Sequence, residues 1–132
     1  MAKSKNHQRR KFVILEHDHP FLHWDLLVER KAADGSSTSG DRVLASWRLL
    51  QPIVPGKWID TEVLPDHRAM YLDYEGPVSN DRGTVKRIAS GVFRAISSAT
   101  SGSLDFELTG CEIAARASLR NSSSGKPQWR FE

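Results

Sequence analysis

The segment EHDHPFLHWDLLVE, residues 16–29, combines three histidines and four carboxylates and then continues into apolar sequence. From residue 21 onward, polar and apolar side chains alternate with the period of two that a β-strand requires. This alternation places His23, Asp25 and Leu27 on one face and an apolar series on the other. The segment therefore predicts a strand that packs one face against the core and carries metal-binding side chains at the edge of that core.

Similar short alternating segments, separated by turns rich in Gly, Ser, Asp and Pro, occur along the rest of the chain. Strands are expected at residues 11–16, 22–30, 42–50, 69–74, 83–88, 91–97, 103–109, 112–119 and 128–132. No long amphipathic helix is expected. Many short strands with this spacing predict an all-β fold, a small antiparallel β-barrel.

The composition fits one soluble domain, since the chain has 132 residues, of which 39% are hydrophobic and 27% charged. We expect a basic, flexible N-terminal arm at residues 1–11 and a barrel domain at residues 12–132. No apolar run approaches the roughly 18 residues of a membrane span, and no secretory cleavage site follows the basic start. The single Cys111 excludes an internal disulfide and a zinc-thiolate site. We therefore expect a cytoplasmic protein with no membrane contact.

The first candidate site is a metal site built from His17, His23 and Asp25. His23 and Asp25 share a strand face, and the short connection containing Pro20 can bring His17 back beside His23. Imidazole and carboxylate ligands together suit a transition metal such as manganese, iron or zinc. The alternative is that His17 and His19 are turn residues and that His23 and Asp25 form a surface pair.

The second candidate site lies in LPDHRAMYLDYEG, residues 64–76, where His67 and Tyr71 are four residues apart and share a face in a strand or a helix. Histidine can act as a general acid and tyrosine can donate a hydrogen bond to a phosphoryl oxygen. Asp73 and Glu75 are further candidate carboxylates in this segment. Their Asp-x-Glu-Gly pattern favours the alternative that they mark the end of a strand at a turn.

These segments, together with LASWRLLQP (44–52), DHRAMYLDYEG (66–76), GTV (83–85), LTGCEIAARASLR (108–120) and Trp129, form an ordered series. The series resembles the 3′-phosphoesterase domain of bacterial DNA ligase D over residues 12–132. The resemblance implies a small β-barrel that binds manganese and removes a 3′-ribonucleoside and a 3′-phosphate from nucleic acid in DNA repair. It implies His17, His23 and Asp25 as metal ligands and His67 and Tyr71 as the phosphate-facing pair. Because the chain has no ligase or polymerase module, we expect it to act either alone or with separate ligase and polymerase proteins as partners.

Two positions depart from the family pattern. Leu27 stands where the family carries an arginine, and Gln51 stands where a basic residue usually follows the Ser-Trp strand. Loss of two cations favours a second interpretation, a nucleic-acid or phosphate-binding module with a weakened site, in which Leu27→Arg is expected to restore some activity. The third interpretation is a non-haem iron enzyme in which His23, Asp25 and His67 bind the iron.

Overall fold

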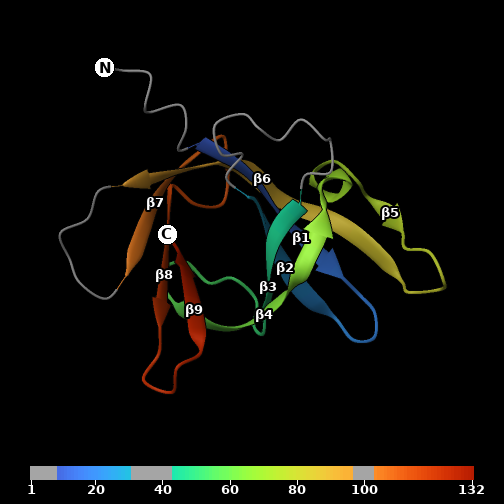
Figure 1. Cartoon of the computed structure of the whole chain (residues 1–132), viewed down its shortest axis with the longest axis horizontal. Coiled ribbons are helices and arrows are strands. Elements are labelled where there is room, and N and C mark those ends of the chain that lie inside the picture. The colour runs from blue at the N-terminus through green and yellow to red at the C-terminus, as the bar shows by residue number, and fades with distance from the viewer. Residues whose placement is uncertain (1–8, 31–42, 97–102) are drawn as a thin grey trace.

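Eight antiparallel strands close into a barrel in the structure, a computed structural model that describes residues 9–30, 43–96 and 103–132 (Figure 1). The hydrogen-bonded order is β1-β2-β3-β4-β9-β8-β7-β6, and β6 pairs with β1 to close the ring, while β5 extends the sheet beyond β6. The strands are β1 (Arg9–His17), β2 (His23–Glu29), β3 (Val43–Leu49), β4 (Trp58–Arg68), β5 (Gly76–Pro77), β6 (Thr84–Ile96), β7 (Leu104–Thr109), β8 (Arg116–Asn121) and β9 (Pro127–Phe131). The predicted all-β barrel is confirmed.

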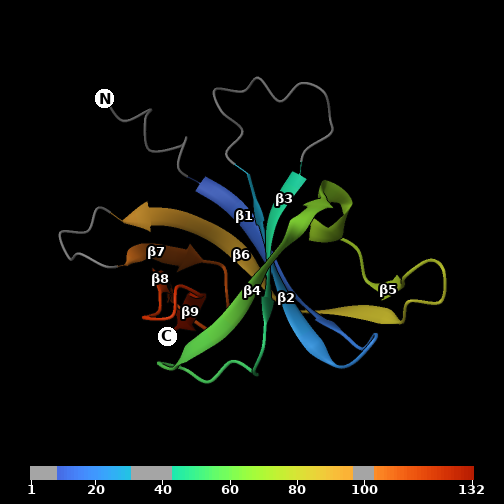
Figure 2. The same cartoon turned by 60° about the horizontal axis from the view of Figure 1, so that its bottom comes forward.

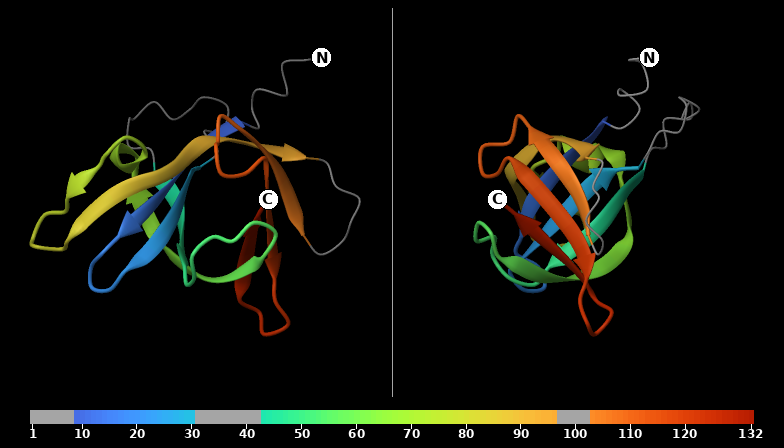
Figure 3. Two further views of the ribbon diagram at one scale, coloured as in Figure 1. Left: turned by 180° about the vertical axis from the view of Figure 1, so that it is seen from behind. Right: turned by 90° about the vertical axis from the view of Figure 1, so that its left-hand side faces the viewer.

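Two long strands join the two ends of the barrel. β4 has 11 residues, pairing with β9 at its start and with β3 for the remainder, and β6 has 13 residues, pairing with β1 and then with β7. Figure 2 shows β4 running from the region of β9 to the short 3-10 helix η2 (Ala69–Leu72). The hairpin β8–β9 and the segment containing η2 and β5 therefore lie at opposite ends of the molecule (Figure 3).

The barrel interior contains the larger apolar cluster, which includes Phe12, Leu26, Phe93 and Trp129, each at most 2% exposed. A second cluster lies on the opposite face of β1, β2, β3 and β6, outside the ring. Its buried members are Val13, Leu15, Leu27, Leu44 and Val85, and partly buried Tyr71, Leu72, Tyr74 and Val78 cover them. The prediction that β2 has one buried face is wrong, because η2 and the residues after it bury the second face as well.

Several strand boundaries differ from the prediction. Strand β4 was not expected, and the segment 69–74, expected as a strand, contains η2 instead. The expected strands 83–88 and 91–97 are one continuous strand that passes through Gly91. A side chain at Gly91 would collide with the carbonyl oxygen of Thr109, so glycine allows β7 to approach β6 there.

At the N-terminus, β1 begins at Arg9, so Arg9, Arg10 and Lys11 belong to a strand and not to the predicted arm. Residues 1–8 of that arm lie outside the described residues. Within the described part of the chain, no helix has the length and apolar character needed to cross a membrane.

Candidate metal centre and phosphate cleft

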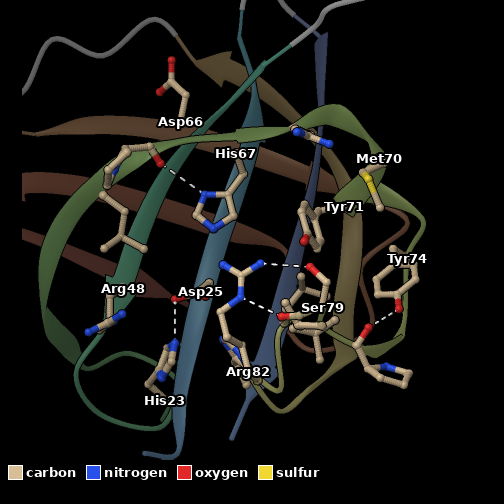
Figure 4. Close-up of a pocket in the computed structure, with 18 residues that line it drawn as sticks. His23, Asp25, Arg48, Asp66, His67, Met70, Tyr71, Tyr74, Ser79 and Arg82 are labelled. Atoms are coloured by element: carbon tan, nitrogen blue, oxygen red, sulfur yellow. Dashed lines mark hydrogen bonds and ion pairs between the residues drawn. The ribbon is translucent and has the colours of Figure 1, made fainter. Parts of the chain in front are cut away.

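A cleft of about 830 Å³ lies on the outer face of the barrel, above the second apolar cluster. Its wall comes from β1 to β4, and its cover comes from η2 and the turn between β5 and β6. All five predicted site residues line it: His17, His23, Asp25, His67 and Tyr71. Figure 4 shows Tyr71, from the cover, near His67, with His23 and Asp25 on β2. The predicted metal and phosphate-facing groups thus share one cleft.

The metal-binding group is assembled by the register of the first hairpin. His17 lies opposite His23 in the β1–β2 pairing, and their ring centroids are 5.0 Å apart. Asp25 is two residues further along the same face of β2. One ligand atom from each of these three residues lies within 4.8 Å of the other two, so the group could hold a metal ion. The predicted return of His17 to the side of His23 is confirmed.

Backbone carbonyls orient both histidines. His23 Nδ1 lies 2.8 Å from the carbonyl oxygen of Phe21, and His17 Nε2 lies 2.8 Å from that of Arg82. A carbonyl only accepts, so each of these nitrogens carries hydrogen and the neutral ring presents its other nitrogen without one. Metal-binding histidines commonly have this arrangement, because the second hydrogen bond fixes both the tautomer and the ring orientation.

The contact between His23 and Asp25 is the clearest indication of a cation. His23 Nε2, the nitrogen left without hydrogen, lies 3.4 Å from Asp25 Oδ1. Both residues are buried, at 3% and 5% exposure, and among the described residues nothing donates a hydrogen bond to Asp25 Oδ1. Two facing lone pairs repel unless a positive charge lies between them. Two ligands about 2.1 Å from one ion would stand roughly 3.0–3.4 Å apart at octahedral or tetrahedral angles, so the residues fit a metal ion.

A hydrogen-bond chain from β3 fixes His67. Ser46 Oγ donates its one hydrogen to the carbonyl of Leu44 at 2.9 Å, so at 2.8 Å it must accept from His67 Nδ1. His67 Nδ1 therefore carries hydrogen, and Nε2 is the nitrogen available to a ligand. The Tyr71 ring packs edge-on against His67 at 5.8 Å. The predicted pair is adjacent, although His67 is the penultimate residue of β4 and Tyr71 lies in η2, so no single strand or helix carries both.

Two arginines that face the cleft supply positive charge near the metal-binding group. Arg48 on β3 lies opposite Asp25 in the β2–β3 register, and Arg82 lies in the turn before β6. Neither arginine was among the site residues predicted from the sequence. Ser46 and Arg48 are two residues apart in β3, so strand alternation directs both side chains to the same face of the sheet. The sequence therefore contained a signal that Arg48 shares a face with the residues of the cleft.

The two departures from the family pattern do not supply charge to the cleft. Leu27 is fully buried in the second cluster, and Gln51 is exposed and does not line the cleft. Because an arginine at position 27 would have to enter that apolar cluster, the structure argues against the expectation that Leu27→Arg restores activity.

The turn that carries Arg82 is held against the β1–β2 loop by Gly83. Gly83 has φ +80°, and a Cβ there would collide with Asp18 Oδ1 and the Cβ of His19. Close by, the Thr84 amide donates to Asp18 Oδ1 at 2.8 Å. Glycine therefore permits the approach that brings the Arg82 carbonyl to His17.

The remaining charged candidates lie outside the metal-binding group. Glu75 accepts a hydrogen bond from the Arg87 amide at 2.7 Å, and neither Asp73 nor Glu75 lines the cleft. Asp66, at the rim, forms a two-point ion pair with Arg30 at 2.9 and 3.0 Å. The hydrogen bond from Arg30 lowers the pKa of the Asp66 carboxyl. His19 is not part of the metal-binding group.

Comparison with known proteins leaves the family undetermined, because no protein-family model and no curated protein matches the chain.

Proposed function

We propose that the protein is a metal-dependent phosphoesterase that processes 3′ ends of nucleic acid in DNA repair, removing a 3′-phosphate or a 3′-ribonucleoside. The observation that supports this proposal most strongly is the buried contact of 3.4 Å between His23 Nε2 and Asp25 Oδ1, in a cleft that also contains His67 and Tyr71. The first pair, with His17, could hold a metal ion between its ligand atoms, and the second pair offers donors for phosphoryl oxygens.

His17, His23 and Asp25 would hold the ion, and the mixed nitrogen and oxygen ligands suit manganese, with zinc or another transition metal as the alternative. When bound, a divalent ion polarises a phosphoryl oxygen and lowers the pKa of a water. His67 presents Nε2 to the cleft, where its protonated form can donate a proton to the leaving oxygen. Tyr71 donates a hydrogen bond to a non-bridging oxygen.

The partner in this proposal is the 3′ end of a DNA strand or of a DNA/RNA primer-template in the cytoplasm. Separate ligase and polymerase proteins would complete the repair reaction. The resemblance of the sequence segments to the phosphoesterase domain of DNA ligase D supports this choice of substrate, and the cleft geometry supports metal-assisted phosphoryl chemistry.

The test is to incubate the protein with Mn²⁺ and a primer-template that bears a 3′-phosphate or one 3′-ribonucleotide, and to resolve the products on a gel. Wild-type protein should release phosphate or shorten the primer only when the metal is present. His23→Ala should abolish this turnover, because it removes a metal ligand, while His19→Ala, which lies outside the group, should retain it. Equal turnover by wild type and His23→Ala would contradict the proposal.

A second candidate is a binding module that holds the phosphorylated end without hydrolysis. The observation that favours it is the burial of Leu27 at 0% exposure, since that position offers no cation to the reacting phosphate. Metal-dependent binding of the 3′-phosphate end without product would support this candidate.

The iron-enzyme interpretation with His67 as a ligand has less support. The compact metal-binding group contains His17, His23 and Asp25 and does not include His67. The iron-enzyme interpretation would be supported by oxygen consumption in the presence of ferrous iron and an added organic acid.

A further inference from the structure

Arg82 is fixed in the cleft by neutral partners. Its Nε donates to the Ser79 carbonyl at 2.8 Å and its Nη2 donates to Ser79 Oγ at 3.1 Å. Within the described ranges, no ion pair involves Arg82. Figure 4 shows its guanidinium in front of the space between His67 and Asp25. Ser79 therefore orients the guanidinium while leaving its charge, and most of its five donors, for a ligand.

Arg48, on β3, lines the same cleft, and in the view of Figure 4 it lies on the other side of Asp25 from Arg82. Its Cα lies opposite that of Asp25, and its guanidinium carbon lies 5.5 Å from the centre of the Phe21 ring. Its buried Nε has no hydrogen-bond partner among the residues that the structure describes. Contact with the Phe21 ring orients the guanidinium without neutralising it.

These arginines change the charge of the cleft. A divalent ion with one carboxylate ligand, Asp25, and two neutral histidines leaves one net positive charge. Arg48 and Arg82 raise the total to three, and Arg68, which also lines the cleft, raises it to four. Asp66, which also lines the cleft, is already neutralised by Arg30. A terminal phosphate monoester carries close to two negative charges at neutral pH, and an internal phosphodiester carries one.

We infer that Arg48 and Arg82 form a two-arginine clamp that selects a terminal phosphate monoester, with its dianionic charge, over a phosphodiester. This inference rests on the proposed function and narrows it from 3′-end processing in general to preferred removal of a 3′-phosphate. Arg48 lies on β3 and Arg82 lies in the turn between β5 and β6. Their positive charges take the place of the two that the family pattern has where this chain has Leu27 and Gln51.

The experiment compares two oligonucleotides of one sequence, one ending in a 3′-phosphate and the other in the methyl ester of that phosphate, with Mn²⁺-loaded protein. We expect kcat/KM to favour the monoester by at least about tenfold, because a hydrogen bond to a charged group contributes about 1.5–3 kcal/mol. Arg82→Gln and Arg48→Gln should each lower monoester turnover roughly 10- to 100-fold and diester turnover less. Arg116→Gln, which removes one exposed positive charge far from the cleft on β8, is the matched control and should leave both values unchanged.

Calorimetric titration with orthophosphate provides a readout that needs no turnover. The dissociation constant of Mn²⁺-loaded protein for orthophosphate should rise in both clamp variants and stay constant in Arg116→Gln. If Arg48→Gln and Arg82→Gln turn over substrate with the monoester preference and the phosphate affinity of the wild type, the clamp is refuted. The proposed function would still stand in that case. Phosphate binding that depends on both arginines without any turnover would support the clamp as a binding site and refute the phosphoesterase. Thermal unfolding of each variant verifies that it is folded.

Discussion

Replacing Asp25 with asparagine separates the effect of this residue on folding from its effect on metal binding. The Asp25 carboxylate is 5% exposed and its Oδ1 lies 3.4 Å from the bare Nε2 of His23. An asparagine amide at the same place would donate a hydrogen bond to Nε2. An unsatisfied buried polar group destabilises a fold by about 1–3 kcal/mol, and more when it is charged. Without metal, Asp25→Asn should therefore be more stable than wild type by about 1–3 kcal/mol.

In the presence of Mn²⁺, the wild type should be more stable than Asp25→Asn. A ligand present at 100 times its dissociation constant stabilises the native state by about 2.7 kcal/mol. For a chain of this length, 1 kcal/mol corresponds to roughly 3–5 °C in Tm, so Mn²⁺ should raise the Tm of the wild type by about 10 °C. Asparagine offers a neutral and weaker ligand, so the Tm of Asp25→Asn should hardly respond to Mn²⁺.

The assay is urea and thermal unfolding of both proteins at pH 8, where histidine is ordinarily neutral, with either EDTA or a series of Mn²⁺ concentrations. Glu112→Gln, a carboxyl change at an exposed position between β7 and β8 and outside the cleft, serves as the matched control and should respond to Mn²⁺ as the wild type does. The reasoning is refuted if Asp25→Asn is less stable than wild type in EDTA, or if Mn²⁺ stabilises the two proteins equally.

Three further changes test other parts of the structure. Gly83→Ala should weaken Mn²⁺ binding about 10- to 100-fold, as measured by metal titration, because displacement of the turn removes the carbonyl that orients His17; unchanged affinity would contradict this role. Leu27→Arg should destabilise the fold by several kcal/mol in urea unfolding, because it places an unpaired charge in the second apolar cluster, whereas Leu27→Met should cost less than about 1.5 kcal/mol. Asp66→Asn should lower stability at pH 7 by about 0.2–1 kcal/mol. Because Arg30 lowers the pKa of Asp66 in the folded state, this difference should disappear as the pH falls below about 4; a constant difference down to pH 2 would exclude the ion pair as its source.

The metal-binding group was predictable because local rules determine it. Strand alternation sets His23 and Asp25 on one face, and a connection of five residues between β1 and β2 returns the chain so that His17 pairs with His23. The barrel class was predictable for a similar reason, since short alternating segments have few other ways to bury their apolar faces.

Other parts of the site depend on contacts that are distant in sequence. β4 was missed because it includes Asp60, Glu62 and Pro65, which are unfavourable in strands. The place of Arg82 depends on the turn after β5, where Asn80 and Asp81 both have positive φ. No periodic pattern extends through such a turn, so the sequence did not predict that Arg82 lies beside the metal-binding group.

The position of the cleft outside the barrel determines which part of the molecule can open. On one side of the second apolar cluster lies the closed ring of strands, and on the other lies a cover that has a four-residue η2 and a two-residue β5 as its regular elements. This cover can separate from the wall without breaking a hydrogen bond of the eight-stranded ring or exposing the interior cluster. Amide hydrogens of residues 70–82 should therefore exchange through local openings of much lower free energy than those of β1 and β2. For the proposed activity, access of a polynucleotide to the metal-binding group would then be governed by the local stability of the cover, independently of the global stability of the barrel.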